Sequence, residues 1–149
     1  MDQNLLEKEA SIFGSVFLLA NKLQALIDQD FAKYGLTAKQ WFLMAVLGKF
    51  FSESATISQL ASVMGSSHQN VKQLALKLEK GGWVRMEKDK HDKRITRVSL
   101  TIQTEQFWEG RQHNDVKFFN ELFANFTESE IDGLFTGLEK LHRAVSQLS

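Results

Sequence analysis

Cysteine and proline are both absent from the 149-residue sequence. Without cysteine the chain can form neither a disulfide nor a Cys-ligated zinc site, and thiol-based redox sensing is excluded. Without proline, the residue that most sharply interrupts a helix, long continuous helices are favoured. Apolar residues make up 43% of the chain, which is enough for a sizeable core, so a disordered protein is not expected.

A long apolar run and a basic N-terminal segment are also missing. No stretch of about 18 consecutive apolar residues occurs, so a membrane-spanning helix is not expected. The first ten residues, MDQNLLEKEA, are acidic and lack the basic segment of a secretory signal. Together these observations predict a cytoplasmic protein with no membrane partner.

The formal net charge is zero, but the charge is unevenly distributed. Residues 56–101 hold nine Lys or Arg against four Asp or Glu, a local charge of +5 that leaves −5 for the rest of the chain. A local basic field can attract nucleic acid even when the whole chain is neutral. Locally basic surfaces are also common on solvated helices and hairpins, so charge alone does not assign a partner.

Apolar residues recur at spacings of three and four through most of the chain and predict six helices. Thr37, Thr56, Ser67 and Thr127 are placed to cap the first turns of four of them. Gly35 suits the left-handed cap that would end the first helix. The predicted helices cover residues 4–33, 38–51, 57–64, 67–80, 102–126 and 129–148, and residues 52–55 are expected to form a loop.

The middle of the chain predicts a helix-turn-helix followed by a β-hairpin. Gly65-Ser66 separates two short helices within residues 57–80. Two runs with β-forming residues follow, at Trp83–Met86 and Ile95–Leu100. The tip between them, Lys88–Arg94, has four cations and no large apolar residue, so it cannot be core. A helix-turn-helix with a basic hairpin is the layout of a winged DNA-binding domain.

Three groups of residues within 36–101 carry a family resemblance. They are Leu36-Thr37-x-x-Gln40-Trp41, Leu74-x-x-x-Leu78-Glu79-Lys80-x-Gly82-Trp83-Val84, and Asp89-x-x-Asp92-x-Arg94 followed by Val98-x-Leu100-Thr101. On these residues the chain resembles the MarR family of winged helix-turn-helix transcriptional regulators. The resemblance implies a mainly α fold with a small β-hairpin wing. In this fold a single MarR-like unit, 1–149, has a DNA-binding region at 36–101 flanked by dimerisation helices at 4–33 and 102–149.

The resemblance also implies a homodimer that binds double-stranded DNA at a pseudo-palindromic operator and represses its own or neighbouring genes. Exposed polar side chains of the second helix of the helix-turn-helix would read the major groove. Arg94 of the wing would enter the minor groove, with Asp92 orienting it and Asp89 shaping the turn. The predicted DNA-binding residues are Ser66, Ser67, His68, Gln69, Asn70, Lys72, Gln73, Lys88, Lys90, Lys93 and Arg94. The plain alternative is a solvated helix face and a surface ion-pair hairpin.

The last predicted helix carries apolar residues in alternating steps of three and four, a heptad seam. The seam consists of Ile131, Leu134, Leu138, Leu141, Val145 and Leu148. It favours burial against a second copy of the chain, and an intramolecular helical bundle is the alternative. The segment 102–106 lacks the Glu/Lys-Gly pair usual in the family, so the fifth helix is expected to start directly.

A small-molecule effector is a further implication of the resemblance. An aromatic pocket with one cation would suit an aromatic or apolar organic anion. The predicted pocket residues are Phe13, Phe17, Trp41, Phe42, Met44, Phe107, Trp108 and Arg111. Aromatic residues at helical spacing are more often ordinary core, and this reading is the stronger of the two.

Other classes of function have little support in the sequence. No catalytic triad order, phosphate-binding glycine loop or cofactor fingerprint is apparent, so neither an enzyme nor a cofactor is expected. The four histidines are scattered. His113 with Glu109 would supply only two metal ligands, where a zinc site needs at least three, so no metal is expected. The alternative to a regulator is a winged-helix protein-interaction module that binds an acidic partner.

Overall fold

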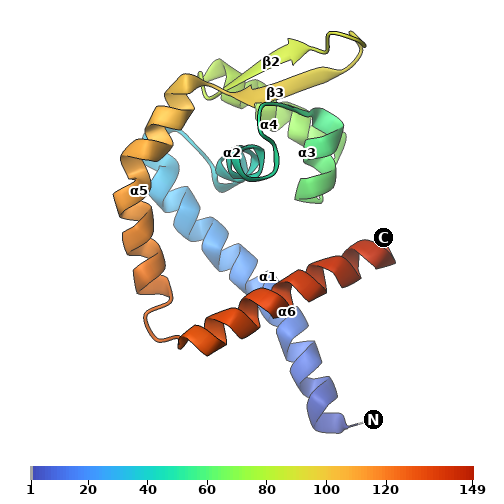
Figure 1. The fold of residues 1–149 in the computed structure, drawn as a ribbon, viewed down its shortest axis with the longest axis vertical. Helices are drawn as coiled ribbons and strands as arrows, with labels where there is room; N and C mark the ends of the chain where they lie inside the picture. The colour runs from blue at the N-terminus through green and yellow to red at the C-terminus, as the bar shows by residue number, and fades with distance from the viewer. Residues whose placement is uncertain (1) are drawn as a thin grey trace. The chain divides into compact units, whose positions relative to one another are not determined.

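The computed structural model describes residues 2–149 and divides into two compact units, residues up to Gln106 and Phe107–Ser149 (Figure 1). The first unit holds most of the elements and all of the strands. Its elements are α1 (Gln3–Phe31), a 3₁₀ turn (Ala32–Tyr34), α2 (Ala38–Phe50), β1 (Ala55–Thr56), α3 (Ile57–Met64), α4 (His68–Lys80), β2 (Val84–Lys88) and β3 (Thr96–Leu100). Helix α5 (Ile102–Leu122) runs across the division, and α6 (Glu128–Leu148) belongs to the second unit. The mainly helical fold with a small β wing is confirmed.

The predicted helix starts are confirmed in detail. The hydroxyls of Thr37, Thr56 and Thr127 each accept a hydrogen bond from the backbone N–H three residues later, where a Gln or Glu completes a capping box. Ser67 caps α4 by accepting from the backbone N–H of Asn70 at 3.1 Å. Gly35 has the expected left-handed conformation at φ 72°, although the chain passes through a 3₁₀ turn before it reaches this glycine.

Helix α2 lies at the centre of the first unit, in contact with α1, α3, α4 and β3 (Figure 1). A helix covered from several sides has no single apolar face, and the periodicity argument therefore placed its buried side imperfectly. Phe42 was expected to face inward but is 43% exposed, whereas Leu43 and Val46 are buried. The helix also ends at Phe50 rather than at residue 51.

Helices α3 and α4 pack through the short apolar side chains predicted for them. Val71, Ala75 and Leu78 of α4 are buried, as are Ile57, Leu60 and Ala61 of α3, while Leu74 and Met64 are half-buried. Gly65 makes the turn with φ 63°, in the left-handed region where glycine is favoured. The helix-turn-helix is thereby confirmed.

The β-sheet has three strands in the order β1-β3-β2, all antiparallel, rather than the two strands of a hairpin. Ala55 was assigned to a loop, but it pairs with Val98 of β3, and Thr56 pairs with Arg97. A two-residue strand is too short to show an alternating pattern, and its partner lies about 40 residues away. Sequence periodicity therefore could not reveal β1.

The hairpin strands are also shifted from their predicted bounds. Strand β2 begins one residue after Trp83 and continues through Lys88, and β3 begins at Thr96 rather than Ile95. Ile95 is 38% exposed at the edge of the turn, whereas Val98 is fully buried. The tip is consequently shorter than predicted, because Lys88 belongs to the paired strand.

Two threonines fasten the end of the hairpin to the start of α5. The Thr101 hydroxyl donates to the Gly82 carbonyl at 2.8 Å, and the buried Thr104 hydroxyl donates to the Trp83 carbonyl at 2.6 Å. The backbone N–H of Thr104 in turn points to the Thr101 hydroxyl oxygen at 3.3 Å. Helix α5 starts directly at Ile102, as expected, but it ends at Leu122 and not at residue 126.

The two terminal helices carry much exposed apolar surface. In α6 no residue is buried, and the six residues of the predicted seam are all at least 38% exposed. The segment Gln3–Tyr34 is long and apolar enough, by length and composition, to cross a membrane, with a mean hydropathy of 1.5 over 18 residues. The lack of an unbroken apolar run was therefore too strict a ground for excluding such a helix. The core helix of a soluble protein can meet the same criterion.

Candidate nucleic-acid interface

The start of α4 presents a row of exposed polar side chains. Ser67 caps the helix, and the residues that follow it alternate between solvent and core according to the helical repeat. The exposed members are Ser67, His68, Gln69, Asn70, Lys72 and Gln73, and Ser66 in the preceding turn is half-buried. The apolar side of the same helix is fixed in the core by Val71, Ala75 and Leu78, so the polar row is held on a rigid element.

The composition of this row suits DNA. Gln and Asn side chains carry a donor and an acceptor that can pair bidentately with adenine, and Lys72 can neutralise a phosphate. The first turn of α4 contains no acidic residue, and the positive end of the helix dipole lies there. The local field at this end therefore favours an anion.

The turn of the wing is organised by Asp89. Its Oδ2 atom accepts the backbone N–H groups of His91 at 3.0 Å and Asp92 at 2.9 Å. Its Oδ1 atom lies 2.6 Å from Nε of Arg97. The bond from Arg97, followed by the two backbone bonds, lowers the pKa of this carboxyl to about 2. The expected turn-shaping role of Asp89 matches these contacts.

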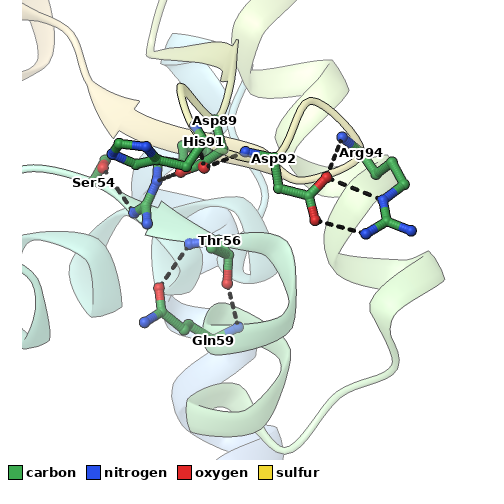
Figure 2. Close-up of polar contacts among 8 residues, drawn as sticks. Ser54, Thr56, Gln59, Asp89, His91, Asp92 and Arg94 are labelled. Carbon is green, nitrogen blue, oxygen red and sulfur yellow. Dashed lines mark hydrogen bonds and ion pairs between the residues drawn. The ribbon is translucent and has the colours of Figure 1, made fainter.

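Asp92 holds Arg94 in a two-pronged ion pair (Figure 2). Oδ1 of Asp92 lies 3.1 Å from Nε of Arg94, and Oδ2 lies 3.1 Å from Nη2. The same pairing lowers the pKa of the Asp92 carboxyl and raises the pKa of the Arg94 guanidinium. The side chain of Arg94 is nevertheless 91% exposed, so the guanidinium is oriented yet remains available to a ligand. Lys88, Lys90 and Lys93 are exposed around it.

Two residues that sequence reasoning passed over complete the wing. Arg97 was counted only as one of nine cations, but its side chain joins Asp89 to the Ser54 hydroxyl, which lies 3.4 Å from Nη1. Ser54 precedes β1 and is 43 residues away in sequence. The only sequence signal for this role is the position of Arg97 in the middle of a predicted strand, where a charged residue needs a partner.

The base of the wing is hydrogen-bonded to α4, the predicted recognition helix. The Oε2 atom of Glu79, near the end of α4, accepts the backbone N–H of Met86 in β2 at 2.7 Å. Gly82 between the two elements has φ 81°, a left-handed conformation that permits the tight passage from helix to strand. The turn at Gly82 and the Glu79–Met86 hydrogen bond therefore hold the wing against α4 within one compact unit.

The predicted effector residues fall into both units. In the first, Phe13 and Phe17 are exposed and meet edge to face with centroids 5.2 Å apart, and Met44 is fully buried core. Trp41 is half-buried beside Phe31, and Phe42 is exposed. In the second, the Phe107 and Trp108 rings are 5.3 Å apart, and the largely buried guanidinium of Arg111 lies 5.7 Å from the Phe107 centroid. Whether they line one pocket stays a prediction.

Metal ligands do not gather in the described structure. Within residues 2–149 no group of three or more His, Cys, Asp or Glu side chains could hold a metal ion. His113 lies on α5 with Val116, Lys117 and Asn120 around a shallow surface hollow.

These features define a winged helix-turn-helix protein. A polar helix start and an exposed wing arginine belong to the same compact unit, and both sit on elements anchored in its core. The sequence pattern of the MarR family matches residues 34–95, which run from the end of the 3₁₀ turn after α1 through the wing turn.

Known proteins with similar sequences or structures agree with this class. The transcriptional activatory protein BadR of Rhodopseudomonas palustris is 23% identical over 122 residues, which are 80% of this chain and 70% of BadR. A MarR/EmrR family regulator from Acinetobacter sp. ADP1 has the same fold, with TM-score 0.79, 24% identity and coverage of 93% and 97% of the two chains. Reduced AbfR bound to DNA, a protein of Staphylococcus epidermidis, matches with TM-score 0.71, 19% identity and 99% of both chains.

Over residues 34–95 the chain is therefore similar to the MarR family of transcriptional regulators. Members of this family are DNA-binding transcriptional regulators and not enzymes. The family resemblance carried by Leu78-Glu79-Lys80-x-Gly82 and Asp89-x-x-Asp92-x-Arg94 is thereby confirmed.

Proposed function

We propose that the chain is a homodimeric regulator that binds double-stranded DNA in a sequence-specific manner at a pseudo-palindromic operator. The observation that carries this proposal is the pairing, on one compact unit, of an exposed Gln/Asn-rich helix start with an exposed, pre-oriented arginine on a wing. A helix fits the major groove, where every base pair is distinguishable, and an arginine suits the negative potential of a narrow minor groove.

The assignment of roles follows from exposure and chain position. Gln69, Asn70 and Gln73 are the candidates for base contacts, because their amides face solvent at or near the start of α4. Ser66, Ser67, His68 and Lys72 complete the helix-side contacts to bases or phosphates. Lys88, Lys90 and Lys93 would contact phosphates beside Arg94.

The terminal helices support a second copy of the chain as the partner. Leu138 and Leu141 are 50% and 38% exposed on a heptad seam that has no buried residue. A two-fold dimer would place two α4 helices in successive major grooves, about 34 Å apart on one face of the DNA. The operator is then a pair of inverted half-sites.

The regulatory direction proposed is repression, because a dimer seated across its own promoter would block polymerase. A relative is named as an activatory protein, so the direction needs its own test. A reporter fused to the upstream DNA should rise in expression when the gene is deleted, and a fall would assign activation. An aromatic carboxylate or a similar apolar anion is proposed to release the DNA, in line with the aromatic residues predicted for the effector.

Fluorescence anisotropy tests the DNA-binding proposal. Labelled DNA from upstream of the gene should be bound much more tightly than scrambled DNA of equal composition. With several lysines and arginines at the interface, affinity should fall steeply between about 50 and 200 mM salt. Equal, weak binding to both DNAs would contradict the proposal and favour a protein-interaction module with an acidic partner.

A further inference from the structure

A series of polar contacts links Ser54, the residue before β1, to the exposed arginine of the wing (Figure 2). It starts at Ser54, whose Oγ lies 3.4 Å from Nη1 of Arg97, and passes from Nε of Arg97 to Oδ1 of Asp89 at 2.6 Å. Oδ2 of Asp89 then accepts the backbone N–H of Asp92 at 2.9 Å. The carboxylate of Asp92 finally accepts two hydrogen bonds of 3.1 Å from the guanidinium of Arg94.

The two ends of this series of contacts differ in their surroundings. Arg97 sits on β3, the central strand, opposite Thr56 of β1, and Thr56 is the N-cap of α3 in a complete capping box. The Asp89 side chain is only 12% exposed, whereas that of Arg94 is 91% exposed. The Arg97 end therefore lies on the central strand of the sheet beside the start of α3, and the Arg94 end projects into solvent.

We propose that Arg97 is a positioning residue for the wing, which aligns Arg94 with the recognition helix through Asp89 and Asp92. The inference rests on the proposed DNA binding of this same surface. An exposed arginine loses side-chain entropy when it is fixed by a ligand, and a guanidinium that is already oriented loses less. The series of bonds supplies that orientation, and Arg97 connects it to Ser54, the residue before β1.

The test compares three substitutions on the same sheet and wing. Arg94→Ala removes the direct contact and should weaken operator binding by roughly tenfold or more. Arg97→Ala should produce a loss of similar size although Arg97 itself is not a contact residue. Arg85→Ala is the matched control, because this substitution also removes one positive charge. Arg85 lies on β2 and forms an ion pair with Glu87 instead of Asp89. It should weaken binding no more than the loss of one phosphate-neutralising charge.

A double variant separates positioning from general support of the fold. If Arg97 acts through Arg94, then Arg97→Ala should cost little more than Arg85→Ala when it is added to Arg94→Ala. A purely structural role would make the two losses multiply. Equal effects of Arg97→Ala and Arg85→Ala in the wild-type background would overturn the inference, since only charge would then matter.

Asp89→Asn supplies a test in which electrostatics and positioning predict opposite signs. The substitution makes the wing more positive by one charge, so simple attraction to DNA should tighten binding. Loss of the carboxylate that links Arg97 to Asp92 should instead weaken binding by several-fold. Tighter binding by Asp89→Asn would overturn the inference.

A measurement without DNA keeps this inference separable from the proposed function. By NMR, the backbone amide of Asp92 and the Nε–H of Arg94 should exchange with solvent faster in Arg97→Ala than in Arg85→Ala. Unchanged exchange would contradict the positioning role even if the operator is bound. If exchange accelerates but wild-type protein does not discriminate operator from scrambled DNA, the proposed function fails, and the alignment of Arg94 with a DNA-reading helix fails with it.

Discussion

The winged region (residues 36–101) and the C-terminal helix α6 make opposite use of their apolar residues. In the winged region Leu43, Leu60 and Val98 are fully buried, and the surface elements are tied by side chains such as Glu79 and Arg97. In α6 no residue is buried and the apolar seam faces outward. The first region completes its own core, whereas the second exposes an apolar surface of the kind that marks an interaction site.

The two regions differ in the kind of sequence pattern that determines their structure. In the winged region, charged and polar residues have specific partners within the chain, and their roles depend on distances inside one unit. In α6 the pattern is the repeat itself, a heptad seam of the kind that packs against a partner helix. We therefore propose that DNA reading and self-association are separated along the sequence.

The largest expected effect comes from breaking the seam of α6. Leu138→Glu with Leu141→Glu places two carboxylates on the apolar face and should convert the dimer to a monomer. Operator affinity should then fall by on the order of a hundredfold or more, because a monomer reaches one half-site only. Light scattering coupled to size exclusion measures the mass.

A matched control adds the same charge on the opposite face of α6. Thr136→Glu with Gln147→Glu should leave the mass and the operator affinity nearly unchanged. If the Leu138 and Leu141 variant still runs at the wild-type mass, the dimer interface lies elsewhere and the contrast drawn between the two regions does not hold.

The next effect concerns the recognition helix. Gln69→Ala and Asn70→Ala should each cost about 1–3 kcal/mol of operator binding if the amide pairs with a base, with little change on scrambled DNA. Lys72→Ala should instead weaken both DNAs alike and lower the salt slope by about one. Anisotropy titrations on both DNAs measure the two patterns. Uniform losses for the amide variants would show that α4 does not read bases.

A smaller effect on stability should distinguish the two regions. Gly82→Ala forces a side chain into φ 81° and should destabilise the winged region by about 1 kcal/mol or more. In the interior of α6, a Cβ atom added at Gly133 would have no neighbour within 4 Å. Gly133→Ala should therefore be neutral or slightly stabilising, since alanine is the better helix former. Thermal unfolding at matched protein concentration measures both. Equal destabilisation would mean that α6 is packed more tightly than its exposure indicates.

The smallest effect at neutral pH is expected from the wing turn. Asp89 has a folded-state pKa of about 2 against an ordinary value of 3.8. A depressed pKa means that the carboxylate stabilises the turn fully above pH 3.8, and that this stabilisation is lost as the pH falls through about 2. The protection factors of the His91 and Asp92 amides should therefore be unchanged between pH 7 and about 5. Loss of protection in that interval would show that the Asp89 bonds do not organise the turn.

Local signals in the sequence predicted most of the fold. The N-caps Thr37, Thr56, Ser67 and Thr127 and the turn at Gly65 depend on residues within four positions of one another, and all were found as expected. The resemblance to MarR regulators located α4 and the wing, and Asp92 pairs with Arg94 only two positions away.

Long-range pairings were the part that the sequence did not reveal. Strand β1 exists because Ala55 meets Val98, and Arg97 gains its role because Ser54 lies beside it after folding. The buried side of α2 was misplaced for a related reason: several elements cover that helix, so no single periodic face marks its core side. Such features depend on which segments meet in space, whereas periodicity describes only the spacing of apolar residues within one segment.

Hydroxyl-radical footprinting of the wild-type protein on its operator tests most directly the claim that a self-contained winged region is paired through the terminal helices. The account predicts two equivalent protected regions related by a two-fold axis, with recognition helices spaced by about 34 Å and minor-groove protection at the flanks where Arg94 enters. A single asymmetric footprint, or protection without the minor-groove flanks, would contradict it.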